Sequence, residues 1–169
     1  MMRLKLVSML GAVAMLAACS GSSDQSAGIA GQGAGANLDG SISRGSLAQL
    51  QSDLNRVGDR VFFETDQWNL RPEGQQTIQG WAQLLRQNPG ANVILEGHAD
   101  ERGTREYNIA LGERRAATAR DFLVSLGIDA RRIRTISYGK ERPAITESNP
   151  DGWAQNRRSV IVVQGLATS

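Results

Sequence analysis

Two residue types that build metal sites and nucleophilic sites are almost missing from this sequence, which has one cysteine, Cys19, and one histidine, His98. Without a second cysteine there is no internal disulfide, so a hydrophobic core must stabilise the fold. A single histidine outside any HExxH motif does not indicate zinc, and no serine or cysteine lies in a nucleophile motif with a histidine base. We therefore expect a protein that is not an enzyme and that carries no metal or other cofactor.

An excess of charge of one sign is also absent once the first 18 residues are set aside. The whole chain has 19 Lys and Arg residues against 17 Asp and Glu residues. Residues 1–18 contain Arg3 and Lys5 and no acidic residue, so the rest of the chain carries 17 charges of each sign. Nucleic-acid binding needs a net basic face. The charge balance therefore predicts no nucleic-acid partner.

No apolar run reaches the roughly 20 residues that a membrane-spanning helix needs. The shorter run at residues 6–16 follows two basic residues and is typical of a secretory signal peptide, which we assign to residues 1–18. The stretch Leu16–Cys19 resembles the bacterial lipobox, in which the chain is cut before the cysteine and the cysteine receives acyl chains. Several acyl chains anchor a protein stably, whereas one does not. The residue after Cys19 is Ser20 and not an aspartate, which at that position would resemble an inner-membrane retention signal. We therefore expect a lipid anchor in the outer membrane. An unmodified thiol at Cys19 is the alternative.

The segment after the expected cleavage point has almost nothing to bury. Residues 19–45 are mostly Gly, Ser and Ala, which predicts a flexible tether after the lipidated cysteine. A tether of this length would span about 30 Å on average and about 90 Å when fully extended. It would let a folded domain work at a distance from a lipid surface. The remaining residues, 46–169, then form one domain of ordinary size.

Hydrophobic periodicity and turn residues predict alternating helices and strands in residues 46–169. We expect, in chain order, a short helix from Ser46, a strand at 59–64, a helix from Pro72 to before Pro89, a strand at 92–99, a long helix from Thr104 to Gly127, a strand at 132–138, at most a helical turn at 153–157 and a strand at 160–163. Leu111, Phe122 and Leu126 are the expected buried residues of the long helix.

After the first helix, the order β-α-β-α-β-(α)-β predicts a two-layer α+β domain with a mixed sheet and helices on one face. Strand–helix–strand units favour parallel neighbours, while the last strand follows a long loop and is free to lie antiparallel.

A charged turn, Gly97–Gly103, lies between the second expected strand and the long helix. Its adjacent carboxylates, Asp100 and Glu101, tend to point apart on a turn, which does not suit an acid–base pair. A purely structural interpretation is available: one of these carboxylates caps the helix and pairs with Arg102 or Arg105. On composition alone this interpretation is the simpler one, and a binding site stays open beside it.

Several separated motifs resemble those of the OmpA-like peptidoglycan-binding domains and occur in the same order. These motifs are Gly97–Thr104, Tyr107–Asn108, Leu111–Ala116, Ser137–Pro143 and Asn156–Arg158. Together with the lipobox and the tether, they resemble most closely the family of peptidoglycan-associated lipoproteins, over nearly all of residues 19–163. The resemblance implies an OmpA-like fold for residues 46–169.

The resemblance also implies a ligand. In this family an aspartate of the turn and the second arginine of the helix hold meso-diaminopimelate in uncrosslinked stem peptides of peptidoglycan, and the matching positions here are Asp100 and Arg115. The free end of diaminopimelate carries an ammonium, which Asp100 can pair, and a carboxylate, which suits the fork of Arg115. Supporting contacts are assigned to Arg102, Thr65, Asp66 and Leu111.

By the same resemblance we expect an outer-membrane lipoprotein on the periplasmic side that binds peptidoglycan non-covalently. It would link the membrane to the wall within the Tol-Pal system and support envelope integrity and cell division, with TolB and other Tol proteins as partners. His98 is expected to be structural, while Trp68 and Trp153, both in loops, are candidates for a protein interface. Two alternatives stay open: an OmpA-like wall-binding domain of another envelope complex, and a wall-remodelling enzyme.

Overall fold

The computed structural model describes residues 44–164. The expected signal peptide, the lipid-modified Cys19 and nearly all of the expected tether lie outside the described residues, as do residues 165–169. Among the described helices, none is both long enough and apolar enough to cross a membrane.

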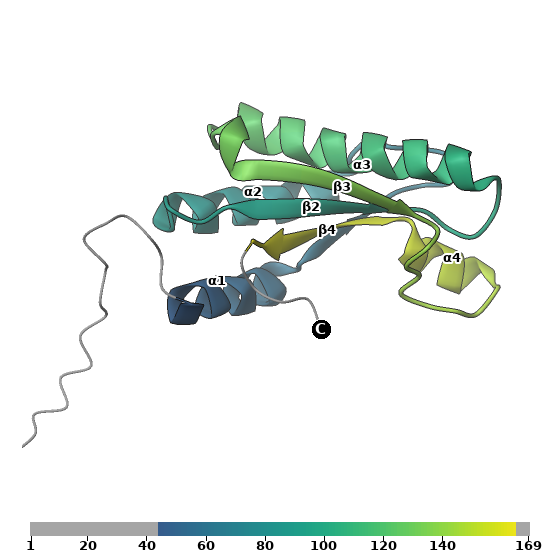
Figure 1. Ribbon diagram of the computed structural model, residues 1–169, viewed down its shortest axis with the longest axis horizontal. Helices are drawn as coiled ribbons and strands as arrows, with labels where there is room; N and C mark the ends of the chain where they lie inside the picture. Colours follow the sequence, from purple (N-terminus) through teal and green to yellow (C-terminus); the bar gives the residue numbers. More distant parts are fainter. Residues whose placement is uncertain (1–43, 165–169) are drawn as a thin grey trace, which may run out of the picture. The chain divides into compact units, whose positions relative to one another are not determined.

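Helices and strands alternate along the described chain (Figure 1). In order they are α1 (Arg44–Val57), β1 (Arg60–Phe62), α2 (Pro72–Gln87), β2 (Val93–His98), α3 (Arg105–Ser125), the short 3-10 helix η1 (Ala130–Arg132), β3 (Ile133–Gly139), α4 (Pro150–Asn156) and β4 (Arg158–Val163). This is the predicted order, and the α+β class is confirmed.

The four strands form one mixed sheet in the order β1-β4-β2-β3. β2 and β3 are parallel, as predicted for strands joined by a helix, and β4 is antiparallel to both of its neighbours. The expectation that β1 and β2 are neighbours is wrong, because β4 lies between them. β4 is apolar along most of its length, so it is better buried inside the sheet than at an edge, where the three-residue β1 lies instead.

One face of the sheet carries the hydrophobic core. The pairing register places Leu95 beside Ile161, and both side chains are fully buried. Buried residues of α1, α2 and α3 pack in the same cluster, among them Leu54, Trp81 and Leu123. The indole of Trp81 also donates a hydrogen bond of 2.6 Å to the carbonyl of Gly58, so its polar atom is satisfied. The predicted layer of helices on one face is therefore formed by α1, α2 and α3.

The long helix α3 begins and ends as the sequence predicts. The Thr104 hydroxyl accepts from the Tyr107 amide at 3.2 Å, which caps the first turn, and Gly127 has a φ of 91° just beyond the last turn. The buried side differs from the prediction, because Leu123 is fully buried whereas Phe122 and Leu126 are only partly buried. The hydrophobic periodicity located the helix correctly, but near its C-terminal end it shifted the predicted buried positions by about one residue.

Three element boundaries differ from the sequence prediction. α1 begins at Arg44, so Ser46 lies in the first turn of the helix instead of capping it. α4 has seven residues and starts at Pro150, where at most one turn was expected further along. Its start was recognisable, since Asn149 accepts from the Gly152 amide and a proline follows in the first turn. β4 also begins earlier than expected, at Arg158.

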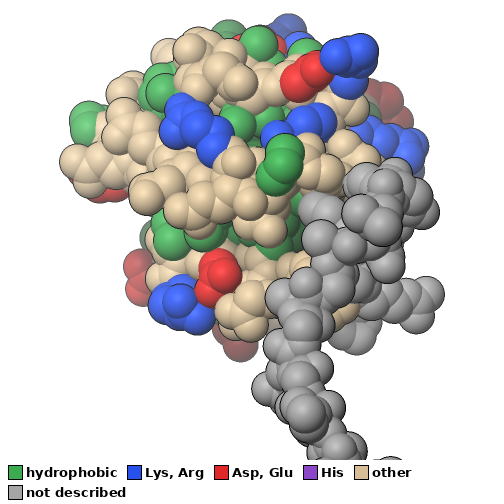
Figure 2. Space-filling view, turned by 90° about the vertical axis from the view of Figure 1, so that its left-hand side faces the viewer, with side chains coloured by type: hydrophobic (Ala, Val, Ile, Leu, Met, Phe, Trp, Pro, Cys, Tyr) green, Lys and Arg blue, Asp and Glu red, His purple; other side chains and the backbone are tan. Residues whose placement is uncertain are grey.

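The topology brings three loops to one end of the sheet. β1 and β2 are both antiparallel to β4, so they run in the same direction and the loops that follow them leave from the same end. β3 is parallel to β2, and its following loop reaches the same end beside α4 (Figure 1). Figure 2 shows the other end of the domain, where Lys and Arg side chains lie interspersed with Asp and Glu side chains. The charged turn of the sequence therefore lies among loops that distant parts of the chain supply.

Candidate functional site

A pocket of about 260 Å³ lies between the loop after β1, the charged turn after β2 and the first turn of α3. Its lining residues are Thr65, Asp66, Asp100, Arg102, Gly103 and Tyr107. Four of the six residues that the sequence singled out for ligand binding are thus together in one pocket. Leu111 and Arg115 are not among the lining residues, and both are buried in α3.

Asp100 is the carboxylate at the centre of this pocket, and it is already paired. Its oxygens accept from the Arg102 guanidinium at 3.1 and 2.7 Å and from the Arg102 amide at 3.1 Å. Arg157, from the segment before β4, reaches the same carboxylate at 3.4 Å. Burial by itself would raise the pKa of Asp100, but the bonds from Arg102 and Arg157 outweigh it and hold the pKa below its usual range. Asp100 is therefore ionised at neutral pH.

Arg115 lies fully buried, and it ties the site together from within the domain. Its guanidinium donates to the carbonyls of Gln67 at 2.9 Å, His98 at 2.8 Å and Glu64 at 3.1 Å. One side chain on α3 thereby fixes both the loop after β1 and the end of β2. Burial lowers its pKa to about 10, so it remains a cation at neutral pH. Among the described residues, the ion-pair partners of Asp100 are two other arginines and not Arg115.

The loop after β1 supplies the opposite wall of the pocket. Asp66 has a φ of 55°, a left-handed conformation that aspartate tolerates better than most residues. The Tyr107 hydroxyl donates to its carboxylate at 3.3 Å, and Arg102 donates to the Thr65 hydroxyl at 3.4 Å. Asp66 and Tyr107 are exposed, so both are available to a ligand that enters the pocket.

Glu101 points away from the pocket, and the predicted divergence of the two carboxylates is observed. Its carboxylate accepts from the Trp153 indole at 2.9 Å and from the Ser148 hydroxyl at 3.0 Å. These hydrogen bonds lower the pKa of Glu101. The Lys140 ammonium donates to the carbonyls of Glu101 and Gly103, which fixes the backbone of the turn. Glu101 thus anchors the turn to α4 and to the loop before it.

Arg102 lies between the two sides of the turn. Its guanidinium stacks over the ring of Trp153, with 4.4 Å between the guanidinium carbon and the ring centroid, while it also binds Asp100. The Arg102 side chain is 42% exposed, compared with 9% for the Asp100 side chain. Of the two arginines paired with the Asp100 carboxylate, Arg102 is the more exposed, since the Arg157 side chain is only 12% exposed.

His98 contributes its backbone to the site, while its side chain is buried. The imidazole lies 5.6 Å from the ring of Tyr138, and the closest carboxylate oxygen, from Glu96, is 3.8 Å away, which is too long for a hydrogen bond. Burial lowers the pKa of His98, so the ring is neutral at pH 7. Within residues 44–164, no group of three or more His, Cys, Asp and Glu side chains is arranged to hold a metal ion.

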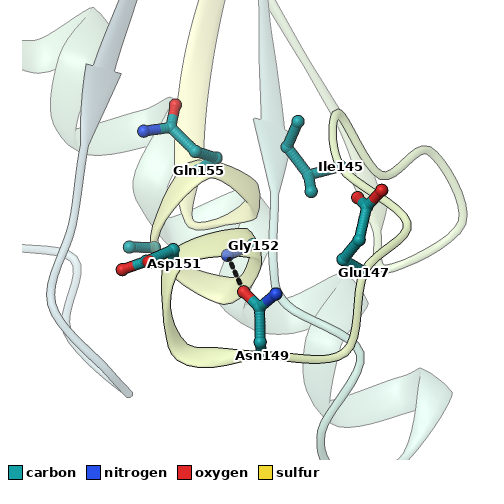
Figure 3. A pocket seen from close by; sticks show the side chains of 7 residues that line it. Ile145, Glu147, Asn149, Asp151, Gly152 and Gln155 are labelled. Carbon is teal, nitrogen blue, oxygen red and sulfur yellow. Dashed lines mark hydrogen bonds between the residues drawn. The ribbon is translucent and has the colours of Figure 1, made fainter.

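A larger hollow, of about 380 Å³, lies on α4 and the loop before it (Figure 3). Its lining residues are Ile145, Glu147, Asn149, Asp151, Gly152, Ala154 and Gln155. The Asn149 side-chain oxygen is used to cap α4 by accepting from Gly152 at 2.8 Å. The hollow has carboxylates but no cationic side chain among its lining residues, so it does not offer both charges to a zwitterion. The smaller pocket around Asp100 does.

Two residues of the site were not assigned by sequence reasoning. Tyr107 follows the cap residue Thr104 by three positions, so it had to lie on the first turn of the helix and near the turn that precedes it. Arg157 belongs to a motif that was recognised, but its contact with Asp100 spans 57 residues of sequence. Without the strand order, the sequence could not place it at this end of the sheet.

Comparisons with known proteins agree with the fold and the motifs. Residues 62–157 match the OmpA family. The peptidoglycan-associated lipoprotein of Rhizobium meliloti (strain 1021) is 48% identical over 154 residues, which cover 90% of this chain and 84% of that protein. The peptidoglycan-associated lipoprotein of Agrobacterium fabrum (strain C58) is 56% identical over 109 residues, which cover 64% of this chain and 62% of that protein.

A solved structure is also similar. The crystal structure of the peptidoglycan-associated lipoprotein from Burkholderia pseudomallei superposes with a TM-score of 0.61 at 38% identity, covering 63% of this chain and 90% of that chain.

Proposed function

The chain belongs to the OmpA family and, within it, to the peptidoglycan-associated lipoproteins, and from this membership we propose that it binds peptidoglycan non-covalently and ties it to the outer membrane. The proposed ligand is the free end of meso-diaminopimelate in an uncrosslinked stem peptide. That end carries an ammonium and a carboxylate on one carbon. The pocket around Asp100 supports this assignment because an anionic and a cationic side chain line it together.

We infer that the ligand enters by replacing an internal partner. In the free protein the Arg102 guanidinium occupies the Asp100 carboxylate, as a ligand ammonium would. The ammonium of the entering ligand pairs with the Asp100 carboxylate and displaces the Arg102 guanidinium. That guanidinium then pairs with the ligand carboxylate on the same carbon. One ion pair is broken and two are formed, so binding does not leave a buried charge without a partner. Arg157 keeps its contact with Asp100 throughout.

Arg115 acts from beneath the pocket in this proposal. Its guanidinium holds three backbone carbonyls and is fully buried, so we propose that it acts on a ligand through its charge and not by direct contact. Its charge is buried and therefore weakly screened, so it attracts a carboxylate into the pocket. Leu111, on the same helix, is buried and does not line the pocket.

The rest of the chain supports a mechanical role. We propose that acyl chains on Cys19 hold the outer membrane while the domain holds the wall, with residues 19–45 as the tether between them. The chain would then couple two layers of the cell envelope without catalysing a reaction. From the same family membership we infer that the Tol proteins, TolB in particular, are its protein partners, and that this assembly supports envelope integrity and cell division.

The observation that carries the proposal is the buried, ionised Asp100, which lines a pocket together with the partly exposed guanidinium of Arg102. Asp100→Asn removes the charge and keeps the shape. Removing one charge from a desolvated pair costs about 2–5 kcal/mol, so we expect the affinity for purified sacculi to fall at least about 30-fold in a sedimentation assay. Glu101→Gln is the matched control, because it alters the neighbouring carboxylate outside the pocket and should bind as the unaltered protein does. Equal binding by all three proteins would remove Asp100 from the site.

A further inference from the structure

An exposed aromatic–cation pair lies next to the pocket, on the same loop and the same helix. The guanidinium of Arg114 stacks over the ring of Trp68, with 4.8 Å between the guanidinium carbon and the ring centroid. Trp68 is 38% exposed and follows Thr65 and Asp66 in the loop after β1, while Arg114 lies on α3. The face of the indole ring attracts the guanidinium and holds it in one place.

The charge of Arg114 is not neutralised by any residue that the structure describes. Between residues 44 and 164 its guanidinium has no carboxylate within ion-pair distance and donates no hydrogen bond. Its neighbour Glu113 does not compensate, because the Glu113 carboxylate faces β3 and accepts from the Thr135 hydroxyl at 2.9 Å. Other exposed arginines, such as Arg120 and Arg131, are paired with an adjacent or nearby aspartate. Arg114 therefore keeps its N–H groups for an anion from outside.

The distance from the Trp68–Arg114 pair to the pocket is within reach of one bound stem peptide. Tyr107, which lines the pocket, and Arg114 are both exposed on α3 and about two turns apart, which is roughly 10 Å along the axis. The loop after β1 runs alongside the helix over this stretch, with Asp66 at Tyr107 and Trp68 at Arg114. A stem peptide held in the pocket by its diamino acid can therefore follow the outer side of this loop to Arg114.

We propose that Arg114, held in place by Trp68, is a second subsite that binds the α-carboxylate of the γ-linked glutamyl residue preceding diaminopimelate in the stem peptide. This inference rests on the proposed function. About nine bonds join the clamped carbon of diaminopimelate to the carbon that bears this carboxylate, which is the length of about three backbone residues and extends to roughly 10 Å. The guanidinium supplies a bidentate partner for the carboxylate. The site thus distinguishes stems with a free glutamyl carboxylate from stems in which it is amidated.

The test is a calorimetric titration with two tripeptide stems, L-Ala-γ-D-Glu-meso-diaminopimelate and its glutamyl α-amide. We expect Arg114→Gln to weaken binding of the acid form by about three- to tenfold, as for a partly exposed pair, and to leave binding of the amide form unchanged. Arg120→Gln is the matched control on the same helix and should change neither affinity. Loss of affinity for both peptides alike, or for neither, would overturn the subsite.

A second pair of variants tests the role of Trp68 as a positioning residue. Trp68→Phe retains an aromatic face for the guanidinium and should keep the preference for the acid form, whereas Trp68→Ala should reduce it. An unchanged preference in Trp68→Ala would contradict this role. Failure of the unaltered protein to bind either peptide would sink the proposed function itself, whereas binding of both with equal affinity would sink only the subsite.

Discussion

At the residue scale, Asp100 and Glu101 show how adjacent carboxylates on one turn acquire different roles. Asp100 is buried against arginines and faces a pocket, while Glu101 is exposed and fastens the turn to Trp153 and Ser148. The difference arises from the turn geometry, which points successive side chains apart. A substitution of Asp100 should therefore affect ligand binding, whereas a substitution of Glu101 should affect the attachment of the turn to α4.

The depressed pKa of Asp100 leads to a prediction about pH. The Asp100 carboxyl is ionised above its lowered pKa. Its ion pairs therefore stabilise the site fully above pH 4, and this stabilisation is lost only as the pH falls through the lowered pKa of Asp100. Burial lowers the pKa of His98, so this residue is neutral at pH 7. We expect sacculus binding to be constant from about pH 5 to 8 and to decline only below about pH 4. Sedimentation across buffers of equal ionic strength measures this. A midpoint near pH 6.5 would instead indicate that a histidine controls binding.

Arg115 gives a second prediction at this scale, because it serves the fold as well as the ligand. Arg115→Ala leaves three carbonyls without their donor and empties a buried volume, so we expect the free energy of unfolding to drop by about 2–4 kcal/mol. Urea denaturation measures the loss. Arg114→Ala, the same change at the neighbouring exposed position, should stay within about 0.5 kcal/mol. Equal stability of both variants would show that Arg115 does not hold the loops.

At the element scale, the contact between β2 and α3 sets the position of the charged turn. Gly97 on the strand and Gly112 on the helix approach so closely that a Cβ at Gly97 would lie 1.9 Å from the Gly112 carbonyl oxygen. Any side chain there must push the helix away from the strand. Since the turn joins these two elements, a shift of α3 would also displace Asp100 from the Arg115 cation.

This close approach can be tested with a pair of glycine variants. Gly97→Ala should lower stability by at least about 2 kcal/mol, because overpacking against backbone is not easily relieved. Gly74→Ala is the matched control in α2, where the added Cβ would make ordinary contacts at 3.6 Å and the helix would gain about 0.5–1 kcal/mol. Chemical denaturation of both variants measures the difference. A Gly97→Ala variant as stable as the unaltered protein would mean that the two elements are less closely packed than described.

Sequence reasoning succeeded here where the signal was local. The cap at Thr104, the proline at the start of α2 and the charged turn were all placed correctly, because each depends on neighbouring residues. It failed where the signal was long-range. The apolar residues of β4 favour a position inside the sheet, but they do not indicate that its neighbours are β1 and β2. The contact of Arg157 with Asp100 depends on that strand order.

The site residues divide in the same way. Asp100 and Arg102 lie in one turn, and their proximity follows from sequence distance alone. The burial of Arg115 could not be foreseen, since an arginine next to another arginine on a helix is normally solvated. Carbonyls from the loop after β1 and from the end of β2 accept its N–H groups and make the buried position favourable.

At the scale of the whole molecule, the balanced net charge and the proposed tether suit a protein that stays attached to the wall better than one that must find it by rapid diffusion. The chain after residue 18 carries equal numbers of charges of both signs, so long-range steering toward the wall is weak. The proposed lipid-anchored tether would make steering unnecessary, because it would keep the domain at a high local concentration near its ligand. Recognition would then depend on the pocket and the neighbouring Arg114, and its selectivity is the property to measure.

The most direct measurement is a calorimetric titration of the chain from Ser20 onward with two stem peptides, one containing meso-diaminopimelate and the other lysine at the same position. The lysine peptide keeps the ammonium but lacks the carboxylate beside it. If Asp100 and the arginines around it recognise both groups, the diaminopimelate peptide binds at least about tenfold more tightly, since one charged hydrogen-bonded contact is lost with lysine. Equal affinity for the two peptides would contradict recognition of a zwitterionic end by this pocket.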